Sequence, residues 1–276
     1  MPELPEVETV RLALEPHVVG EVVTDVRVRT ARLRTPLSGR KLAEHAANRR
    51  IIGLQRRGKF LVAELEGRRA FVLHLGMSGS FRVVPQEIPF RKHEHVAWEL
   101  SNGMSWRLCD PRRFGWVIPC CLAAEHALPA LLKDLGPEPL DGAFSGAYLY
   151  TVTRARKATI KDLLMDQRVV AGIGNIYANE ALYRAGISPR RRAGNVGKAR
   201  CAKLAESVKG VLADALACGG TTIRDYASVN GSEGHFQVCL DVYGREGESC
   251  GRCPESVIKR TVVSGRSTYY CPRCQR

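Results

Sequence analysis

The stretch HVAWELSNGMSWRLC, residues 95–109, decides how the first half of the chain folds. Two short runs rich in aromatic and β-branched residues flank Asn102-Gly103, a dipeptide typical of tight hairpin turns. Runs of the same kind, FLVAEL at 60–65 and AFVLHL at 70–75, come earlier in the chain. The pattern predicts short strands that pack as a β-sandwich.

One helix is expected before these strands. Pro5 stands in its first turn, where the missing proline N–H is tolerated. Val7, Val10 and Leu14 recur on one face, and the helix is expected to fade near Pro16. Residues 1–135 are therefore predicted to form an N-terminal β-sandwich domain that begins with a helix.

The second half of the chain changes to helical patterns. LGPEPLDGAFSG, residues 135–146, has the glycine and proline content of a linker, which we place at 136–146. Beyond it, Ile160, Leu163 and Leu164 share a helical face, and two further helical stretches follow. We expect a helical domain over 147–234 and an α+β multidomain chain as a whole.

Four cysteines near the C-terminus have the spacing of a metal site. Cys250 and Cys253 form one CxxC pair, and Cys271 and Cys274 form a second. Paired CxxC knuckles at this separation are typical of a zinc ribbon in which protein fills all four positions, so the expected cofactor is one structural Zn²⁺. We place this zinc finger at 235–276. The other six cysteines are expected to be buried or inert.

The chain is strongly basic. Its 276 residues carry a formal charge of +14 and a pI near 9.6, which favours a polyanionic partner, either nucleic acid or an anionic membrane surface. No apolar run approaches the roughly 18 residues that span a bilayer. The acidic N-terminus is also unlike a signal peptide, so the expected location is the cytoplasm, where the cysteines would be reduced thiols or metal ligands.

Two segments offer anion-binding features. Gly172 and Gly174 are expected to make a tight turn with Asn175 as the N-cap of a helix, whose N–H groups suit a phosphate. Ordinary capping is the alternative explanation. In the ribbon, Gly265 is expected at a hairpin turn that presents Arg266 either to solvent or to a phosphate.

The N-terminus PELPEV, residues 2–7, places a proline beside carboxylates. If Met1 is trimmed, Pro2 becomes a free secondary amine, which is either accidental or a nucleophile. An α-amine has an unperturbed pKa of about 7.7 to 8.0, against roughly 10.4 for lysine, so more of it is unprotonated at neutral pH.

Taken in order, several motifs resemble bacterial formamidopyrimidine-DNA glycosylase along essentially the whole chain. They are PELPEVETV at the start, RRGKF (56–60), LHLGMSG (73–79), DPRRFG (110–115), MDQRVVAGIGNIYANEALYRAGI (165–187), GGTTIRDY (219–226) and the terminal ribbon with GRSTYYCPRCQ. Several of these strings are weak singly, but together they are very specific.

The resemblance implies a β-sandwich, a helix-two-turns-helix module and a zinc finger, with double-stranded DNA held in the cleft between them. It implies an enzyme of base excision repair that excises 8-oxoguanine and formamidopyrimidines and then cleaves the abasic strand by β,δ-elimination. Pro2 would attack the sugar C1′ and form a Schiff base. Glu3 would donate a proton, and Glu6 would support the site or pin the first helix, the structural role being favoured.

The resemblance also implies further site residues. Lys59 would contact phosphate and donate a proton in the first elimination, and Arg266 would bind the flanking phosphate and act in the second. Met77, Arg112 and Phe114 would fill the hole left by the flipped base, with the arginine facing the orphaned cytosine. The remaining residues expected along the DNA path are His74, His93, Arg156, Lys161, Asn175 and Tyr243. The enzyme is expected to act as a monomer on lesions or abasic sites in the bacterial nucleoid.

The sequence departs from the family pattern at a few positions. Pro254 and the following Glu255-Ser256-Val257 alter the first turn of the ribbon, Ser78 follows the wedge methionine, and the loop 227–235 is this chain's own. Three other classes of protein share part of this pattern.

Enzymes that resemble endonuclease VIII and remove oxidised pyrimidines tend to begin Pro-Glu-Gly-Pro, whereas this chain has Leu4 in place of the glycine. A non-catalytic DNA-binding protein with a zinc ribbon would need neither a free Pro2 nor Glu3. An N-terminal-proline tautomerase would have no use for the ribbon or for the DNA wedge.

Overall fold

The structure is a computed structural model and describes residues 1–124, 126–219 and 240–276. The described chain divides into two compact units, one containing Met1–Lys133 and the other containing Asp134–Cys218 together with residues 240–276. The helices of the second half and the C-terminal ribbon therefore share one unit. The loop 227–235 and most of the GGTTIRDY motif lie outside the described residues. Among the described residues, no helix has the length and apolar character needed to cross a membrane.

The first unit contains one antiparallel sheet of eight strands in the order β5-β7-β6-β1-β2-β3-β4-β8. The strands are β1 (Val22–Val28), β2 (Arg49–Arg57), β3 (Phe60–Leu65), β4 (Arg69–His74), β5 (Ser80–Pro85), β6 (Glu94–Leu100), β7 (Met104–Cys109) and β8 (Trp116–Cys121). The predicted hairpin is confirmed, because β6 and β7 are adjacent antiparallel strands in which Trp98 lies opposite Trp106.

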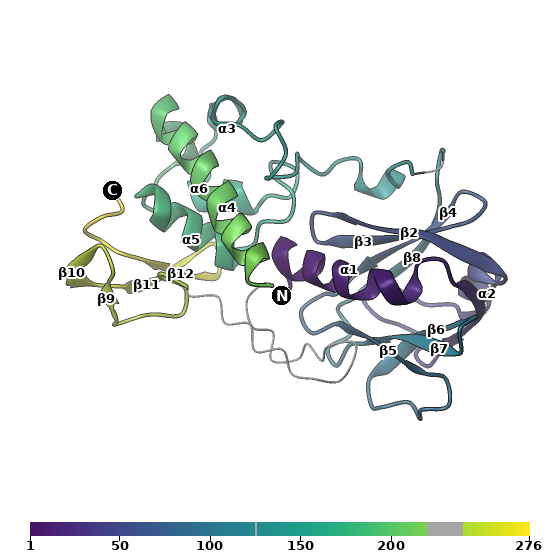
Figure 1. The fold of residues 1–276 in the computed structure, drawn as a ribbon. Helices are drawn as coiled ribbons and strands as arrows, with labels where there is room; N and C mark the ends of the chain where they lie inside the picture. Colours follow the sequence, from purple (N-terminus) through teal and green to yellow (C-terminus); the bar gives the residue numbers. More distant parts are fainter. Residues whose placement is uncertain (125, 220–239) are drawn as a thin grey trace. The chain divides into compact units, whose positions relative to one another are not determined.

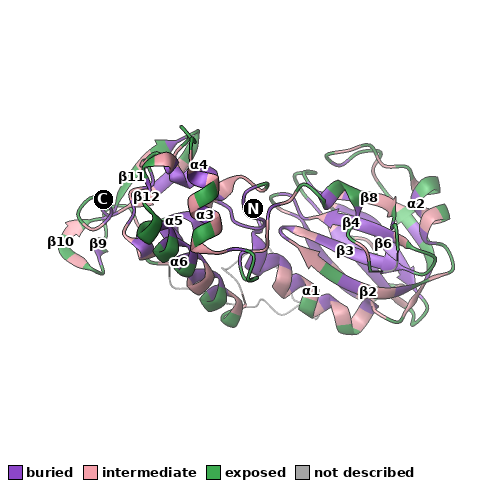
Figure 2. Cartoon of the chain, turned by 90° about the horizontal axis from the view of Figure 1, so that it is seen from above, coloured by how far each residue is buried: buried purple, intermediate pink, exposed green. Residues whose placement is uncertain are grey.

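The sheet folds over on itself where β1 meets β2 by two residue pairs only, so its two halves form the layers of a sandwich (Figure 1). The core lies between the layers and unites Phe71 of β4 with Trp98 and Trp106 of the other half. The Phe71 and Trp98 rings are 5.6 Å apart and meet edge to face. Buried stretches of β3, β4 and β6 are visible in Figure 2. The predicted N-terminal β-sandwich is confirmed.

Helix α1 (Leu4–Val18) packs its apolar face into the same core through Val7, Val10 and Leu14. It ends at Val18, close to the end near Pro16 that the sequence predicts. Proline removes one N–H of the helix ladder, yet the next turn still closes because the backbone N–H of Val19 donates to the carbonyl of Glu15 at 3.1 Å. A second helix, α2 (Gly39–Ala46), starts at Ser38, whose hydroxyl accepts a hydrogen bond from the N–H of Lys41.

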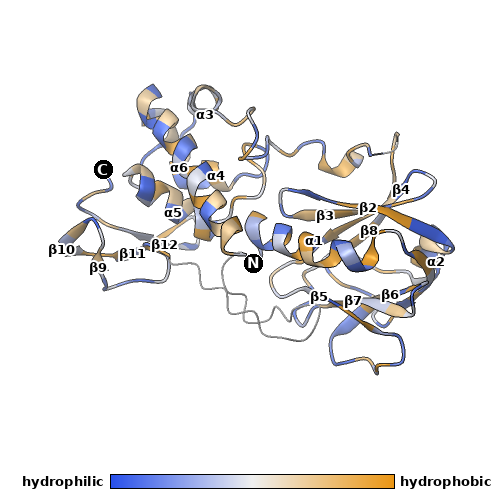
Figure 3. Cartoon of the chain, viewed as in Figure 1, coloured by the Kyte–Doolittle hydropathy of each residue, from blue (hydrophilic) through white to orange (hydrophobic). Residues whose placement is uncertain are grey.

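The second unit is built on four α-helices, α3 (Gly146–Thr153), α4 (Ile160–Met165), α5 (Asn175–Ala185) and α6 (Lys198–Ala217). A short 3₁₀ turn, η2 (Ala193–Asn195), precedes α6, and another, η1 (Ala130–Leu132), lies at the end of the first unit. Hydrophilic and hydrophobic stretches alternate along α6 (Figure 3), as expected for a helix with one buried face. The segment that resembles a linker packs against the rest of the second unit, because the Gly136 N–H donates to the Gln167 backbone carbonyl at 2.8 Å and Phe144 is fully buried.

The C-terminal ribbon contains four short strands, β9 (Ser249–Cys250), β10 (Cys253–Val257), β11 (Lys259–Val263) and β12 (Arg266–Tyr270). β9 pairs with β10, and β11 pairs with β12. Ser264 and Gly265 join β11 to β12 with φ angles of 48° and 76°, the left-handed pair that a two-residue hairpin turn requires. The tight turn therefore leaves Arg266 exposed at the first position of β12.

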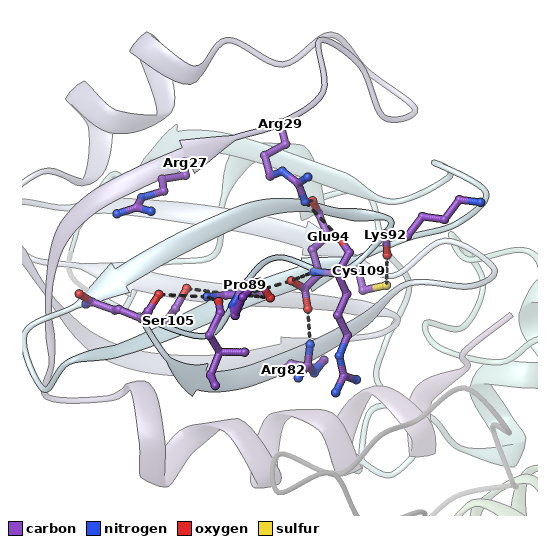
Figure 4. A network of polar contacts seen from close by, with 12 residues as sticks. Arg27, Arg29, Arg82, Pro89, Lys92, Glu94, Ser105 and Cys109 are labelled. Atoms are coloured by element: carbon purple, nitrogen blue, oxygen red, sulfur yellow. Dashed lines mark hydrogen bonds and ion pairs between the residues drawn. The ribbon is translucent and has the colours of Figure 1, made fainter.

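A buried polar network holds the crossover between β5 and β6. Both strands flank β7, so residues 86–93 must pass over β7. From β7, the fully buried Arg107 guanidinium donates to the Ile88 carbonyl at 2.7 Å and to the Glu94 carboxylate at 3.2 Å. Glu94 also accepts hydrogen bonds from Arg82 (Figure 4) and from the Arg91 backbone N–H. The crossover is thus tied to the sheet by buried charge.

We expect Arg107→Met to lower the free energy of unfolding of the first unit by about 3 kcal/mol, because it leaves the buried Glu94 carboxylate with less compensation. Urea denaturation measures the change. Arg40→Met is the matched control, since Arg40 pairs with Glu44 at 3.1 Å but is 87% exposed; its loss should stay below about 0.5 kcal/mol. Equal losses in the two variants would contradict the structural role of the network.

Candidate functional site

The start of α1 buries the residues that the sequence singled out. Pro2 is buried, and Glu3 is 2% exposed. The Glu6 carboxylate accepts a hydrogen bond from the backbone N–H of Glu3 at 2.8 Å as part of a capping box. In this structure Glu6 therefore holds the backbone beside Pro2, and it is 4% exposed.

The β2–β3 hairpin carries Lys59, which is 5% exposed. This hairpin is linked to α1 by an ion pair between Arg56 and Glu8 at 2.9 Å. Burial alone would raise the pKa of Glu8, but Arg11 and Arg56 beside it lower that pKa overall, so the carboxylate stays ionised. The pair fastens the N-terminal half of α1 to the strand that leads into the Lys59 turn.

His74 ends β4 in a row of aromatic rings. Its imidazole lies 4.8 Å from the Phe60 ring and 5.7 Å from Trp116, the residues opposite it on β3 and β8. The backbone N–H of Gly76 donates to Nδ1 at 2.9 Å, so in the neutral ring the proton sits on Nε2. Burial, with help from Lys59 and Arg34, lowers the pKa of His74 to about 4. His74 is thus a neutral donor at physiological pH.

This lowered pKa predicts an acid-sensitive first unit. Because the folded state disfavours the imidazolium, stability is complete above the unfolded pKa of about 6.5 and is lost as pH falls toward the folded value. We expect His74 to contribute a loss of about 2 kcal/mol between about pH 7.5 and about pH 5. His74→Asn, which keeps an acceptor for Gly76, should remove that part of the dependence. Urea titrations of both proteins at the two pH values measure it; parallel curves would contradict it.

Three residues expected to fill the DNA stack lie on two turns of the sandwich. Met77 is 45% exposed on the turn after β4, and Phe114 is 42% exposed on the turn after β7. The Arg112 guanidinium lies 4.9 Å from the centre of the Phe114 ring. His93 ends the crossover described above with a φ of 69°, and its carbonyl accepts a hydrogen bond from the Asp110 N–H at 3.0 Å. The structure thus gathers these residues at neighbouring turns.

In the second unit, three of the predicted residues meet on the ribbon. The Lys161 ammonium on α4 is buried and donates to the Thr268 hydroxyl at 2.6 Å. The Asn175 side-chain amide and Lys161 both donate to the Ser267 carbonyl, at 2.9 and 3.3 Å. Ser267 directly follows Arg266, so α4, α5 and β12 bring Lys161, Asn175 and Arg266 to one place.

The predicted N-cap of α5 is corrected by one residue. Gly174, with extended φ and ψ of −131° and −153°, is the N-cap, and Asn175 is the first helical residue. The physical reason is that Gly174 takes the non-helical geometry of the cap, which releases the Asn175 side chain to bind the ribbon. Of the other residues predicted in this unit, Arg156 is exposed, and Tyr243 is half-buried with its ring 5.1 Å from that of Tyr269.

Sequence reasoning missed Glu180, which holds Tyr243 in place. Its buried carboxylate accepts three backbone N–H groups, from Asp241 at 2.8 Å, Val242 at 3.0 Å and Tyr243 at 2.8 Å. Burial raises the pKa of Glu180, and these N–H groups oppose the rise. A glutamate inside the NIYANEALYRAG pattern gives no local signal of this role, because its partners lie some 60 residues further along the chain.

The four predicted zinc ligands converge. Their four sulfur atoms all lie within 4.8 Å of one another, from Cys250, Cys253, Cys271 and Cys274. The Cys250 and Cys274 sulfurs are 3.9 Å apart, close to the roughly 3.8 Å separation that tetrahedral zinc with bonds of about 2.3 Å requires. The residues fit one structural Zn²⁺, and four thiolates leave no coordination position for a substrate.

Two of the residues that depart from the family pattern, Glu255 and Ser256, contact the second knuckle of the ribbon. Glu255 forms an ion pair with Arg273 of the second knuckle. The Ser256 hydroxyl lies 3.5 Å from the Cys271 sulfur, within hydrogen-bond range for sulfur. Outside the zinc group, burial raises the pKa of Cys120 to about 11, so it remains a thiol, whereas the adjacent Cys121 is exposed.

These features define a class of multidomain zinc-ribbon proteins. Its members have a β-sandwich whose first helix buries the N-terminal residues, followed by helices that share a unit with a four-cysteine ribbon. The chain belongs to the formamidopyrimidine-DNA glycosylase family. Family models match the N-terminal domain at residues 1–117, the H2TH domain at 135–227 and the zinc finger found in FPG and IleRS at 247–276.

Individual relatives agree over the full length. The chain is 50% identical to formamidopyrimidine-DNA glycosylase from Thioalkalivibrio sulfidiphilus and 47% identical to that from Methylococcus capsulatus, with all of each chain covered. Among solved structures, a Lactococcus lactis FPG mutant bound to Fapy-dG DNA matches with 34% identity, complete coverage of both chains and a TM-score of 0.91. The MutM (FPG) protein from Thermus thermophilus matches with 41% identity over 99% of this chain and 98% of that chain, with a TM-score of 0.84.

Proposed function

We propose that this chain is a bifunctional DNA glycosylase and abasic-site lyase that excises 8-oxoguanine and formamidopyrimidines from double-stranded DNA. The observation that carries the proposal is the buried start of α1, where Pro2 and Glu3 lie side by side and the Glu6 carboxylate fixes the backbone between them at 2.8 Å. A zinc-ribbon protein that only bound DNA would need neither a free Pro2 amine nor Glu3 beside it. The proposed enzyme works as a monomer in the cytoplasm, on oxidised bases or abasic sites.

The proposed chemistry starts from the Pro2 amine once Met1 is removed. Its nitrogen bonds to the sugar C1′, the bond from C1′ to the base breaks, and the departing base takes up the proton that the amine loses. The bond from C1′ to the ring oxygen then opens to give an iminium ion. Glu3 supplies the proton that the ring oxygen takes up, a role for which burial suits a carboxylic acid because burial disfavours the charged form.

The later steps are assigned to two cations. Lys59, buried on the β2–β3 hairpin, donates the proton in the elimination that breaks the 3′ side. Arg266, exposed at the first residue of β12, binds the flanking phosphate and assists the second elimination. Both assignments rest on their matched motifs and on the tight hairpin turns that precede them, at Gly58 and at Ser264-Gly265.

The proposed DNA contacts come from both units. Neutral His74 would donate a hydrogen bond to DNA through Nε2–H. His93 would contact DNA from the crossover that Arg107 and Glu94 hold in place. In the second unit, Lys161 and Asn175 keep the ribbon strand that carries Arg266 against the helices, and Arg156 and Tyr243 extend this surface. Met77 and Phe114 are the apolar wedges, and Arg112 faces the orphaned cytosine.

The substrate class is tested by measuring excision from matched duplexes. We expect strand cleavage at 8-oxoguanine opposite cytosine to exceed cleavage at thymine glycol opposite adenine by at least about tenfold, a difference on the order of 1.4 kcal/mol in the barrier. Leu4 stands where sequences resembling endonuclease VIII tend to have glycine, which favours this purine preference over the endonuclease VIII alternative. The reverse order of rates would support that alternative, and cleavage of neither duplex would favour a protein that only binds DNA.

A further inference from the structure

A single carboxylate connects the two turns that carry the proposed wedge. Asp110 is fully buried at the end of β7. Its Oδ1 accepts a hydrogen bond from the Ser78 hydroxyl at 2.8 Å, and its Oδ2 accepts one from the Gly115 backbone N–H at 2.7 Å. The Ser78 hydroxyl oxygen in turn accepts the backbone N–H of Arg112 at 3.2 Å. The turn of Met77 and the turn of Arg112 and Phe114 thus share one hydrogen-bond network.

The two turns also meet backbone to backbone. A Cβ atom at Gly76 would lie 2.5 Å from the carbonyl carbon of Phe114, and one at Gly115 would lie 2.9 Å from the His74 carbonyl oxygen. No side chain fits at either position, so the backbones of the two turns are in direct contact, with no side chain between them that could change its conformation. The exposed tips, with Met77 and Phe114 each over 40% exposed, therefore project from a base that is closely packed.

We propose that Ser78 and Asp110 are positioning residues that lock Met77, Arg112 and Phe114 into one rigid wedge. The inference rests on the proposed function, because a wedge matters only to a protein that flips a base. Flipping costs a few kcal/mol of pairing and stacking, which the inserted side chains must offset. Tips that moved independently would lose part of that compensation, and Arg112 would no longer be held opposite one particular base.

The test compares three variants. Ser78→Ala removes the hydroxyl bridge, and Ser78→Thr keeps it. Ser101→Ala is the matched control, because the Ser101 hydroxyl makes the same kind of bridge in the β6–β7 turn, donating to Glu21 at 2.6 Å and accepting the Val22 N–H at 3.0 Å. Three quantities are measured for each: excision of 8-oxoguanine opposite cytosine and opposite adenine, cleavage at a preformed abasic site, and the fluorescence of a 2-aminopurine beside the orphaned base.

We expect Ser78→Ala to slow excision opposite cytosine about tenfold, the effect of one lost hydrogen bond in a network that includes a charge. Its preference for cytosine over adenine should shrink, and the rise in 2-aminopurine fluorescence should weaken. Cleavage of the abasic duplex, which has no base to flip, should change less than about twofold. Ser78→Thr should behave like the unaltered chain, and Ser101→Ala should leave all three readouts unchanged.

Two results would overturn the lock: equal behaviour of Ser78→Ala and Ser101→Ala, or a loss of abasic-site cleavage as large as the loss of excision, which would indicate damage to the chemical site or to the fold. The fluorescence signal reports insertion and not chemistry. If the unaltered chain raises the fluorescence but excises nothing, the proposed function is overturned. The lock would still be supported in that case if the rise in fluorescence is weaker for Ser78→Ala than for the unaltered chain.

Discussion

A chain extended by two residues before Met1 should form no borohydride-trapped adduct with a duplex carrying 8-oxoguanine opposite cytosine, whereas the trimmed chain should be trapped through Pro2. The extension keeps the Pro2 nitrogen in a peptide bond, where its lone pair is delocalised into the carbonyl and cannot attack C1′. Loss of a covalent nucleophile commonly lowers turnover by a factor on the order of a thousand or more. Mass mapping of the cross-linked peptide identifies the nitrogen.

The control for this experiment is the trimmed chain with Pro2→Gly, which has a free primary amine in place of the secondary amine of proline. We expect it to be trapped more weakly than the unaltered chain and more strongly than the extended one. The extended chain must still bind a duplex with an abasic-site analogue, so that lost trapping reports chemistry and not binding. An adduct from the extended chain that maps to Lys59 would identify this lysine as the nucleophile and refute the role of Pro2.

Removing zinc, or changing Cys271 to serine, should abolish DNA binding and leave the sandwich folded. Structural zinc contributes about 10–16 kcal/mol to small sites of this kind, so the ribbon should unfold without it. The ribbon carries Arg266 and supplies the Ser267 and Thr268 oxygens that hold Lys161 and Asn175. Its loss would therefore separate Lys161, Asn175 and Arg266, which the ribbon brings together.

The measurement is DNA affinity before and after chelation, with circular dichroism of the strands as the test of the sandwich. The sandwich has its own core around Phe71, Trp98 and Trp106 and should keep its signal. Cys120→Ser is the matched control, because Cys120 is half-buried in β8 and outside the four-cysteine group. Undiminished binding and strand cleavage after loss of the metal would refute the role given to the ribbon.

Features set by local rules could be predicted from the sequence. The Asn102-Gly103 turn, the face of α1 and the CxxC pairs depend on residues close in the chain, and the structure contains each of them. The N-cap of α5 lies one residue earlier than the sequence predicts. Asn175 is suited both to an N-cap and to the first helical position, and its distant partner, the Ser267 carbonyl, favours the second.

The sequence by itself therefore determined the fold class, the zinc ligands and, through its motifs, the family. Only the tertiary structure showed that Arg107 and Glu94 fasten the crossover, that Glu180 holds the backbone at Tyr243, and that Asp110 joins two turns. The physical reason is that a buried charge must be satisfied wherever the fold supplies a partner. Those partners lie far away in the chain or on another strand, so no local pattern reveals them.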